Sequence, residues 1–171
     1  ADAQWAGTIL DVGRGGGGAD NDTPVLAVNN VSGTEGTDGF AVFSVSLSNL
    51  STTPVSFNLA LANGSALGGG TDYGSGGAGN LQVSTDGGLS WADAAGATIP
   101  ALGTGVLVRT PIVNDPLDEN AESFTLTATR TAGITGNASA IGTGTISDDD
   151  GAPLISINDV TVNEAAGTMT F

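Results

Sequence analysis

The feature that most constrains the fold of this chain is a series of short runs in which apolar and polar residues alternate. Residues 42–48, 55–61 and 123–129 alternate in this way, and 106–113 and 142–147 show two further strand patterns. A period of two places every second side chain on one face of a β-strand. Clusters of Gly, Asn and Asp separate the runs, as is typical of turns, and helical patterns are almost absent. The pattern predicts an all-β fold, an immunoglobulin-like β-sandwich of about seven strands.

One segment near the start of the chain recurs near its end. The sequence VLAVNNVSGTE at 25–35 aligns with LISINDVTVNE at 154–164, so Glu35 and Glu164 are 129 positions apart. A period of this length is too long for a solenoid and predicts separate domains in a row, with partial neighbouring repeats at both ends. The predicted organisation is the tail of a preceding repeat plus a Gly-rich linker at 1–24, a complete domain at 25–151, and the first strand of a following repeat at 152–171.

The partial copy at the end of the chain cannot bury its apolar face as an isolated strand. It can pair with an exposed edge of the complete domain, exchange with another copy of the chain, or stay loose, and we favour the first two. In a further arrangement, 1–11 and 154–171 fold together as a second, smaller sheet. The expected partners are therefore adjacent repeats of the same chain, with strand exchange between copies as an alternative.

The charge of the chain is strongly one-sided. Three Arg residues stand against 18 Asp and Glu, which gives a net charge of −15. Binding to nucleic acid or to an anionic membrane surface needs a basic patch, so neither is predicted as a partner. No apolar run approaches the roughly 18 residues of a membrane span, so no membrane insertion is expected.

The chain also lacks His and Cys. Zinc, copper and iron sites use imidazole or thiolate ligands, and Ser-His-Asp or Cys-His catalysis needs His as well. Carboxylate pairs are present, but no other catalytic group accompanies them, so we do not expect an enzyme. An acid-rich chain with oxygen ligands alone points to Ca²⁺, with Mg²⁺ or Mn²⁺ as less favoured ions.

Three consecutive aspartates, Asp148, Asp149 and Asp150, follow the last predicted strand. Their mutual repulsion costs free energy unless a cation lies among them. Ca²⁺ takes roughly six to eight oxygen ligands, and neighbouring side chains that point in different directions can bridge several ions. The run lacks the ligand spacing of an EF-hand loop, so it predicts another kind of calcium site.

A second acidic segment, Asp115-Pro-Leu-Asp118-Glu119-Asn-Ala-Glu122, follows the strand at 106–113. With the aspartate run it resembles the Calx-beta family, the calcium-binding module of sodium–calcium exchangers that also recurs in large bacterial surface proteins. The resemblance covers about 25–150, and five elements match it in order. These are Glu35 after the first strand, Asp72-Tyr73 after a Gly-rich loop, the strand from Arg109 to Val113 that leads into Asp115, the spacing of Asp115, Glu119 and Glu122, and the final Asp148–Asp150.

The resemblance implies a sandwich with more than one calcium ion clustered at one end, near the junction with the next domain. Pro116 stands where many family members carry another acid, a departure for which Asp118 can partly compensate. The positions that the resemblance implies as ligands lie at strand ends or in loops, where side-chain oxygens can converge. The implied metal ligands are Glu35, Asp72, Asp115, Asp118, Glu119, Glu122, Asp148, Asp149 and Asp150.

Two further motifs carry weaker signals. The sequence STDGGLSW at 84–91 resembles the Asp-box hairpin of sialidase propellers, in which the Asp and Gly shape a turn and the Trp plugs the hairpin base. We expect a structural role, because scattered Arg residues and a single Tyr cannot supply sialidase chemistry. The sequence GGGGAD at 15–20 nearly matches the RTX nonapeptide, but one imperfect copy predicts a linker, in which Asp20 and Asp22 could help to hold an ion.

Together these patterns predict a calcium-binding structural repeat of a large bacterial RTX-type adhesin, located extracellularly on the bacterial cell surface. Ca²⁺ would rigidify the loops and the inter-domain junction, in place of disulfides. The alternative is a Ca²⁺-dependent module in which 67–79 and the hairpin at 84–91 recognise a sugar or a peptide. An exposed Trp91 or Trp5 next to an ion would favour that alternative.

Overall fold

The computed structural model of the chain describes residues 23–171. The predicted tail of a preceding repeat and the Gly-rich linker lie almost wholly outside the described residues. The same holds for Asp20 and Asp22, for Trp5 and for the proposed pairing of 1–11 with the end of the chain.

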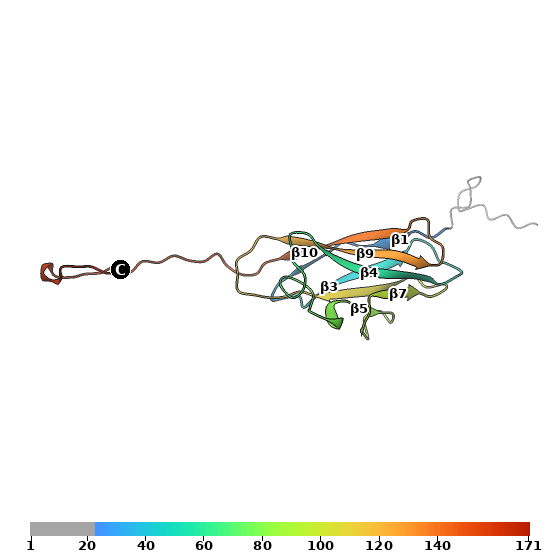
Figure 1. Cartoon of the computed structure of the whole chain (residues 1–171), viewed down its shortest axis with the longest axis horizontal. Coiled ribbons are helices and arrows are strands. Elements are labelled where there is room, and N and C mark those ends of the chain that lie inside the picture. The colour runs from blue at the N-terminus through green and yellow to red at the C-terminus, as the bar shows by residue number, and fades with distance from the viewer. Residues whose placement is uncertain (1–22) are drawn as a thin grey trace, which may run out of the picture.

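The described residues fold into two five-stranded sheets that pack face to face (Figure 1). Sheet A has the order β1 (Leu26–Val28), β3 (Phe40–Leu47), β8 (Gly105–Pro111), β5 (Gln82–Ser84) and β6 (Ala92–Asp93). Sheet B has the order β2 (Val31–Thr34), β10 (Ser139–Ser147), β9 (Glu122–Ala132), β4 (Val55–Asn63) and β7 (Gly96–Ile99). Residues 23–171 also contain two short 3₁₀ helices, η2 (Ala78–Asn80) and η3 (Glu164–Ala166). The predicted all-β sandwich is confirmed.

The five strand patterns named from the sequence correspond to β3, β4, β8, β9 and β10. The structure has ten strands rather than about seven, for two reasons. The first copy of the repeat divides between the sheets, because β1 pairs antiparallel with β3 while β2 pairs parallel with β10. In addition, 82–99 contributes the short strands β5, β6 and β7.

The core follows directly from the alternation along the strands. Every second residue of β3 is buried, namely Ala41, Phe43, Val45 and Leu47. The residues between them are exposed or half-buried. Phe124 of β9 faces them and meets the Phe43 ring edge-on, with ring centroids 5.9 Å apart. Full burial of such a side chain contributes roughly 1.5–3 kcal/mol, so the inward rows of the two sheets supply the main stabilisation.

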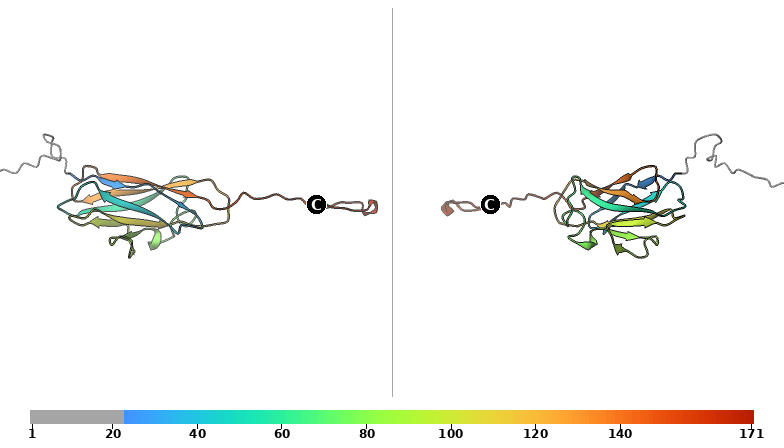
Figure 2. Two further views of the ribbon diagram at one scale, coloured as in Figure 1. Left: turned by 180° about the vertical axis from the view of Figure 1, so that it is seen from behind. Right: turned by 45° about the vertical axis from the view of Figure 1, so that its right-hand side comes forward.

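The segment after the sandwich, 151–171, extends away from it and forms no strand (Figures 1 and 2). Leu154 and Ile155 are 97% and 100% exposed. The expectation that this segment pairs with an edge of the domain is therefore wrong for this structure. The first copy of the same sequence forms β1 and β2, which occupy one edge of each sheet. That it begins a following repeat, or exchanges between copies, stays a prediction.

Within the described part of the chain, no helix combines the length and the hydropathy needed to cross a membrane.

Candidate metal centre

The candidate site lies at one end of the sandwich, where β2, β4, β8 and β10 end and β9 begins. Three of its acids continue the inward-facing rows of these strands. Glu122 lies two positions before buried Phe124, and Asp148 lies two positions after buried Ile146. Glu35 likewise lies two positions after Gly33, which is buried on β2. Because the side-chain period of a strand is two, these carboxylates extend past the core at the open end of the sandwich.

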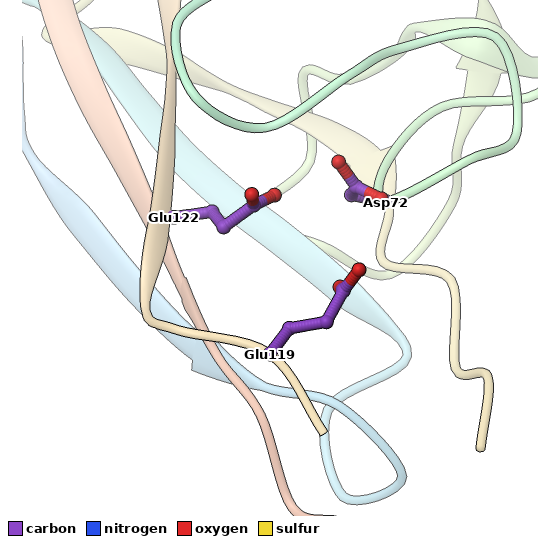
Figure 3. Close-up of side chains that lie close together, drawn as sticks. All are labelled: Asp72, Glu119 and Glu122. Carbon is purple, nitrogen blue, oxygen red and sulfur yellow. The ribbon is translucent and has the colours of Figure 1, made fainter. Parts of the chain in front are cut away.

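The first cluster consists of Asp72, Glu119 and Glu122, with one carboxylate oxygen of each within 4.8 Å of the others. Figure 3 shows the three side chains pointing toward one another, with Glu119 and Glu122 on one segment and Asp72 on another. The Asp72 carboxylate accepts a hydrogen bond of 2.6 Å from the Leu67 N–H, and its carbonyl accepts one of 3.0 Å from the Val113 N–H. The Gly-rich loop thus holds a buried carboxylate against the segment that follows β8.

The second cluster consists of Asp148, Asp149 and Asp150, which also have carboxylate oxygens within 4.8 Å of one another. The Asp148 carboxylate accepts hydrogen bonds from the N–H groups of Glu119 at 2.9 Å and Asp150 at 3.1 Å. These bonds lower the pKa of Asp148. The bond from Glu119 also joins the two clusters, since Glu119 belongs to the first.

Glu35 is 5% exposed and reaches the same end from β2. Burial raises its pKa, a hydrogen bond from the Asp115 N–H opposes that rise, and the charges of Asp115, Glu119 and Asp148 add to it. The backbone of Glu35 is tied to β10, because its N–H donates to the Ser147 carbonyl at 2.9 Å.

The last of the predicted ligands, Asp118, lies close enough to Asp150 for the two carboxylates to repel each other. The pKa of Asp150 is raised by burial and then by repulsion from Asp149, Asp148, Asp115 and Asp118. All nine predicted ligands are therefore brought together at this end of the sandwich. Whether each of them binds a metal stays a prediction.

The crowding has a clear electrostatic signature. The pKa of Glu122 is raised from its ordinary value of 4.5 to about 7, first by burial, then by a hydrogen bond with Asp72 and repulsion from neighbouring carboxylates. The pKa of Glu119 is also raised, first by burial and then by repulsion from Asp115, Asp72 and Asp148. Charged carboxylates held this close destabilise the fold unless a cation or a proton lies between them. Their oxygen-only donor set fits a hard cation such as Ca²⁺.

Two further residues at this end, Gly36 and Asn114, were not predicted from the sequence. Gly36 has a φ of +63°, and a Cβ added there would collide with the Asp149 carboxylate and the Asn114 side-chain oxygen. Asn114 therefore presents a neutral oxygen next to Asp149, of the kind that also binds Ca²⁺. Its position just before Asp115 was the available signal. No feature of the sequence marks Gly36, because its role depends on the close approach of loop 148–150 to loop 35–39.

Comparison with known proteins agrees with this architecture. No family model and no curated protein matches the chain. Among solved structures, the calcium binding domain CBD12 of CALX1.1 superposes with a TM-score of 0.52 at 16% identity, over 73% of this chain and 44% of that one. CBD12 from CALX1.2 gives 0.49 at 17% identity, over 72% and 46%, and the apo-form Calx CBD1 domain gives 0.49 at 16%, over 74% and 99%.

The chain thus spans less than half the length of the CALX1.1 structure. The expected resemblance to Calx-beta domains is confirmed at the level of the fold, since CBD12 of CALX1.1 shares this sandwich. The alternative of calcium-dependent ligand binding through 67–79 stays a prediction, although that loop does carry Asp72 into the cluster.

Proposed function

We propose that this chain is a calcium-binding structural repeat of a large bacterial cell-surface adhesin, and that Ca²⁺ rigidifies its loops and the junction with the next domain. One observation carries the proposal. Nine acidic residues from four separate segments meet at one end of the sandwich, and several of them have raised pKa values. An unligated surface gains nothing from such crowding, whereas a calcium site requires it.

More than one ion fits this arrangement. One Ca²⁺ takes roughly six to eight oxygens, and several of these can come from backbone carbonyls, side-chain amides and water. The two carboxylate clusters each offer three side chains, and the Glu119 N–H bond to Asp148 joins them. We infer one ion at each cluster, with Glu35 and Asp115 between them. The shared fold with a structure described as a calcium binding domain supports this proposal.

The mechanical role follows from the place of the clusters in the chain. Asp148, Asp149 and Asp150 lie directly between β10 and the segment 151–171, which leaves the sandwich at this end. An ion bound there ties the exit of the chain to the loops that carry Asp72 and Glu119. This restrains the direction in which a following domain would start. The absence of Cys and the strong acidity suit an extracellular protein that uses Ca²⁺ rather than disulfides as its cross-link.

The test is thermal unfolding of the whole chain in EDTA, in millimolar CaCl₂ and in MgCl₂ at matched ionic strength. Binding to the folded state alone adds about 2.7 kcal/mol at a concentration about 100 times Kd, so CaCl₂ should raise the Tm well above its value in EDTA. Equal shifts in CaCl₂ and MgCl₂, or no shift, would contradict the proposal.

A matched pair of variants separates loss of the site from general damage. Glu122→Gln removes one charge from the first cluster and should raise the Tm in EDTA while it reduces the gain from CaCl₂. Glu164→Gln makes the same chemical change in the exposed segment after the sandwich and should alter neither value. Isothermal titration of both variants with CaCl₂ then gives the number of ions lost.

A further inference from the structure

The outer face of sheet A, near the end of β8 that leads to the acidic site, carries a guanidinium group that two aromatic rings contact. Arg109 lies on β8, opposite Val42 of β3 on one side and Gln82 of β5 on the other. Its Cζ is 3.9 Å from the centroid of the Phe40 ring and 4.2 Å from that of the Trp91 ring. Both distances are well inside the limit of about 6 Å for a cation–π contact, so the guanidinium plane is held in one orientation.

Trp91 is itself fixed by the hairpin at 84–91. Asp86 accepts hydrogen bonds from the Ser84 hydroxyl at 2.7 Å and from the Ser90 N–H at 2.9 Å, and bonds of this kind lower its pKa. The indole N–H of Trp91 donates to the Gly88 carbonyl at 3.1 Å. The hairpin therefore has the structural role expected from its sequence, and it presents Trp91 rigidly to Arg109.

The hydrogen bonds of Arg109 leave its charge without an acidic partner. Its Nε donates to the Gln82 side-chain oxygen at 2.9 Å, and the Gln82 amide donates to Asp93 at 2.9 Å. Gln82 thus stands between the guanidinium and the nearest bonded carboxylate. Among residues 23–171, no carboxylate forms an ion pair with Arg109, and no acceptor is bonded to its two terminal nitrogens.

An unpaired, pre-oriented guanidinium is notable in a chain with a net charge of −15. Most of its freedom is already lost in the folded state, so a ligand that binds it loses little further entropy. The other described arginine, Arg130, donates to the Gly133 carbonyl instead. The Nε of Arg130 is buried without a hydrogen-bond partner, whereas the guanidinium of Arg109 lies against two aromatic rings on the outer face of sheet A.

We propose that the arginine patch, defined as Phe40, Val42, Gln82, Trp91 and Arg109, binds the carboxylate of an acidic sugar. The terminal nitrogens of a guanidinium match the two oxygens of a carboxylate in a paired, charge-assisted geometry. Phe40 and Val42, 39% and 40% exposed, offer apolar surface beside these donors for the C–H face of a sugar ring. Charge and shape thus fit one ligand that has both an acid and an apolar face.

The size of the patch favours a sugar over a protein. A stable protein interface needs about 800 Å² on each partner, whereas the arginine patch consists of five side chains. The neighbouring outward residues of β3, Ser44 and Ser46, are small and hydroxylated, which suits further sugar hydroxyls. Repulsion from the acidic end opposes the binding of an anion, and salt weakens this repulsion, since the Debye length at physiological salt is about 8 Å.

The site uses no metal ion, so it is independent of the proposed calcium function. The test is a titration of the ¹⁵N-labelled whole chain with sodium glucuronate at constant ionic strength, in EDTA and again in CaCl₂. The NMR signals of the Arg109 Nε–H and the Trp91 indole N–H report on the patch. We expect both to shift saturably with glucuronate in either buffer, to shift with sodium succinate only at much higher concentration, and not to shift with glucose or glucuronamide.

Variants test the assignment to Arg109. Arg109→Gln should weaken glucuronate binding about tenfold or more, the cost of one charge-assisted hydrogen bond pair. Arg14→Gln carries the same change of charge outside the described residues and should have no effect. Arg109→Lys keeps the charge but loses the paired geometry, so it should also weaken binding; it serves if the Gln variant does not fold.

Several results would overturn the proposal. One is the absence of a saturable shift in the wild-type chain. Another is equal binding of succinate and glucuronate, which would reduce the patch to a bare carboxylate site. A third is unchanged affinity in both Arg109 variants. The wild-type comparison of glucuronate with its neutral amide needs no variant, so a folding defect cannot leave the question open.

Discussion

The ring of Tyr73 stacks on the ring of Phe124, with centroids 4.1 Å apart and an interplanar angle of 13°. Tyr73 directly follows Asp72, and Phe124 lies two residues after Glu122. Two of the three acids in the first cluster are therefore anchored to neighbouring rings of the hydrophobic core. The Tyr73 hydroxyl also donates to the Asn63 side-chain oxygen at 2.6 Å, which fixes the end of β4 to the same point. The core and the candidate metal centre thus share one aromatic contact.

Removal of this contact should weaken both stability and calcium binding. Tyr73→Ala deletes a fully buried ring and should cost about 3–5 kcal/mol, the usual range for loss of a large aromatic side chain. It should also weaken calcium binding, because Asp72 loses its anchor. Urea unfolding in EDTA and titration with CaCl₂ measure the two effects.

Tyr73→Phe is the matched control. It keeps the stack and removes only the hydroxyl bonded to Asn63, so it should cost about 1 kcal/mol and leave calcium affinity nearly unchanged. Equal losses in the two variants would show that the ring stack does not position the ligands.

Much of the site could be predicted, because the alternation that places core residues on the inner face of a strand also places the acids just beyond the strand on that face. Glu35, Glu122 and Asp148 each share the inward parity of a strand whose apolar pattern is plain in the sequence. The arginine patch could not be predicted in the same way. It needs the register that sets Arg109 opposite Val42, and a hairpin that returns Trp91 to β8. Local alternation fixes which face of the sheet a residue occupies, but the exact pairing also depends on turn geometry and on the path of the loops.

The pH dependence of the calcium-free domain should follow from its raised pKa values. The pKa of Glu122 is about 7 in the folded state and near 4.5 when unfolded, so the folded state binds more protons between these values. The corresponding stability is fully present below pH 4.5 and is lost as the pH rises through 7. Glu35 and Glu119 act in the same direction. In EDTA, we therefore expect the Tm to fall between pH 5 and pH 8.

Two comparisons check the origin of this dependence. Glu122→Gln should flatten the profile, because its neutral amide no longer titrates. In CaCl₂ the slope should diminish or reverse, since the ion competes with protons and binds more tightly as the pH rises. A profile in EDTA that rises from pH 5 to pH 8 would contradict the assignment of Glu122.

The hydroxyl of Thr110 offers a stabilising substitution. Thr110 is fully buried on β8, and its Oγ1 has no hydrogen-bond partner among the described residues. A buried hydroxyl without a partner costs about 1–3 kcal/mol, and Val has nearly the same shape. Thr110→Val should therefore raise the free energy of unfolding by about 1 kcal/mol. Thr110→Ser keeps the hydroxyl but leaves a small cavity, so denaturant unfolding should show it to be destabilised.

Gly36 provides the sharpest test of the second cluster. A side chain at this position is disfavoured twice, by a φ of +63° and by collision of its Cβ with the Asp149 carboxylate and the Asn114 side-chain oxygen. Gly36→Ala should displace loop 148–150 and weaken calcium binding about tenfold or more, at a cost in stability of about 1 kcal/mol for the strained backbone. Gly39→Ala is the control in the same loop, since its Cβ would meet no atom within 4 Å. Titration with CaCl₂ should show fewer or weaker sites in Gly36→Ala and none lost in Gly39→Ala. The same affinity in both variants would mean that Asp149 does not contribute to the metal centre.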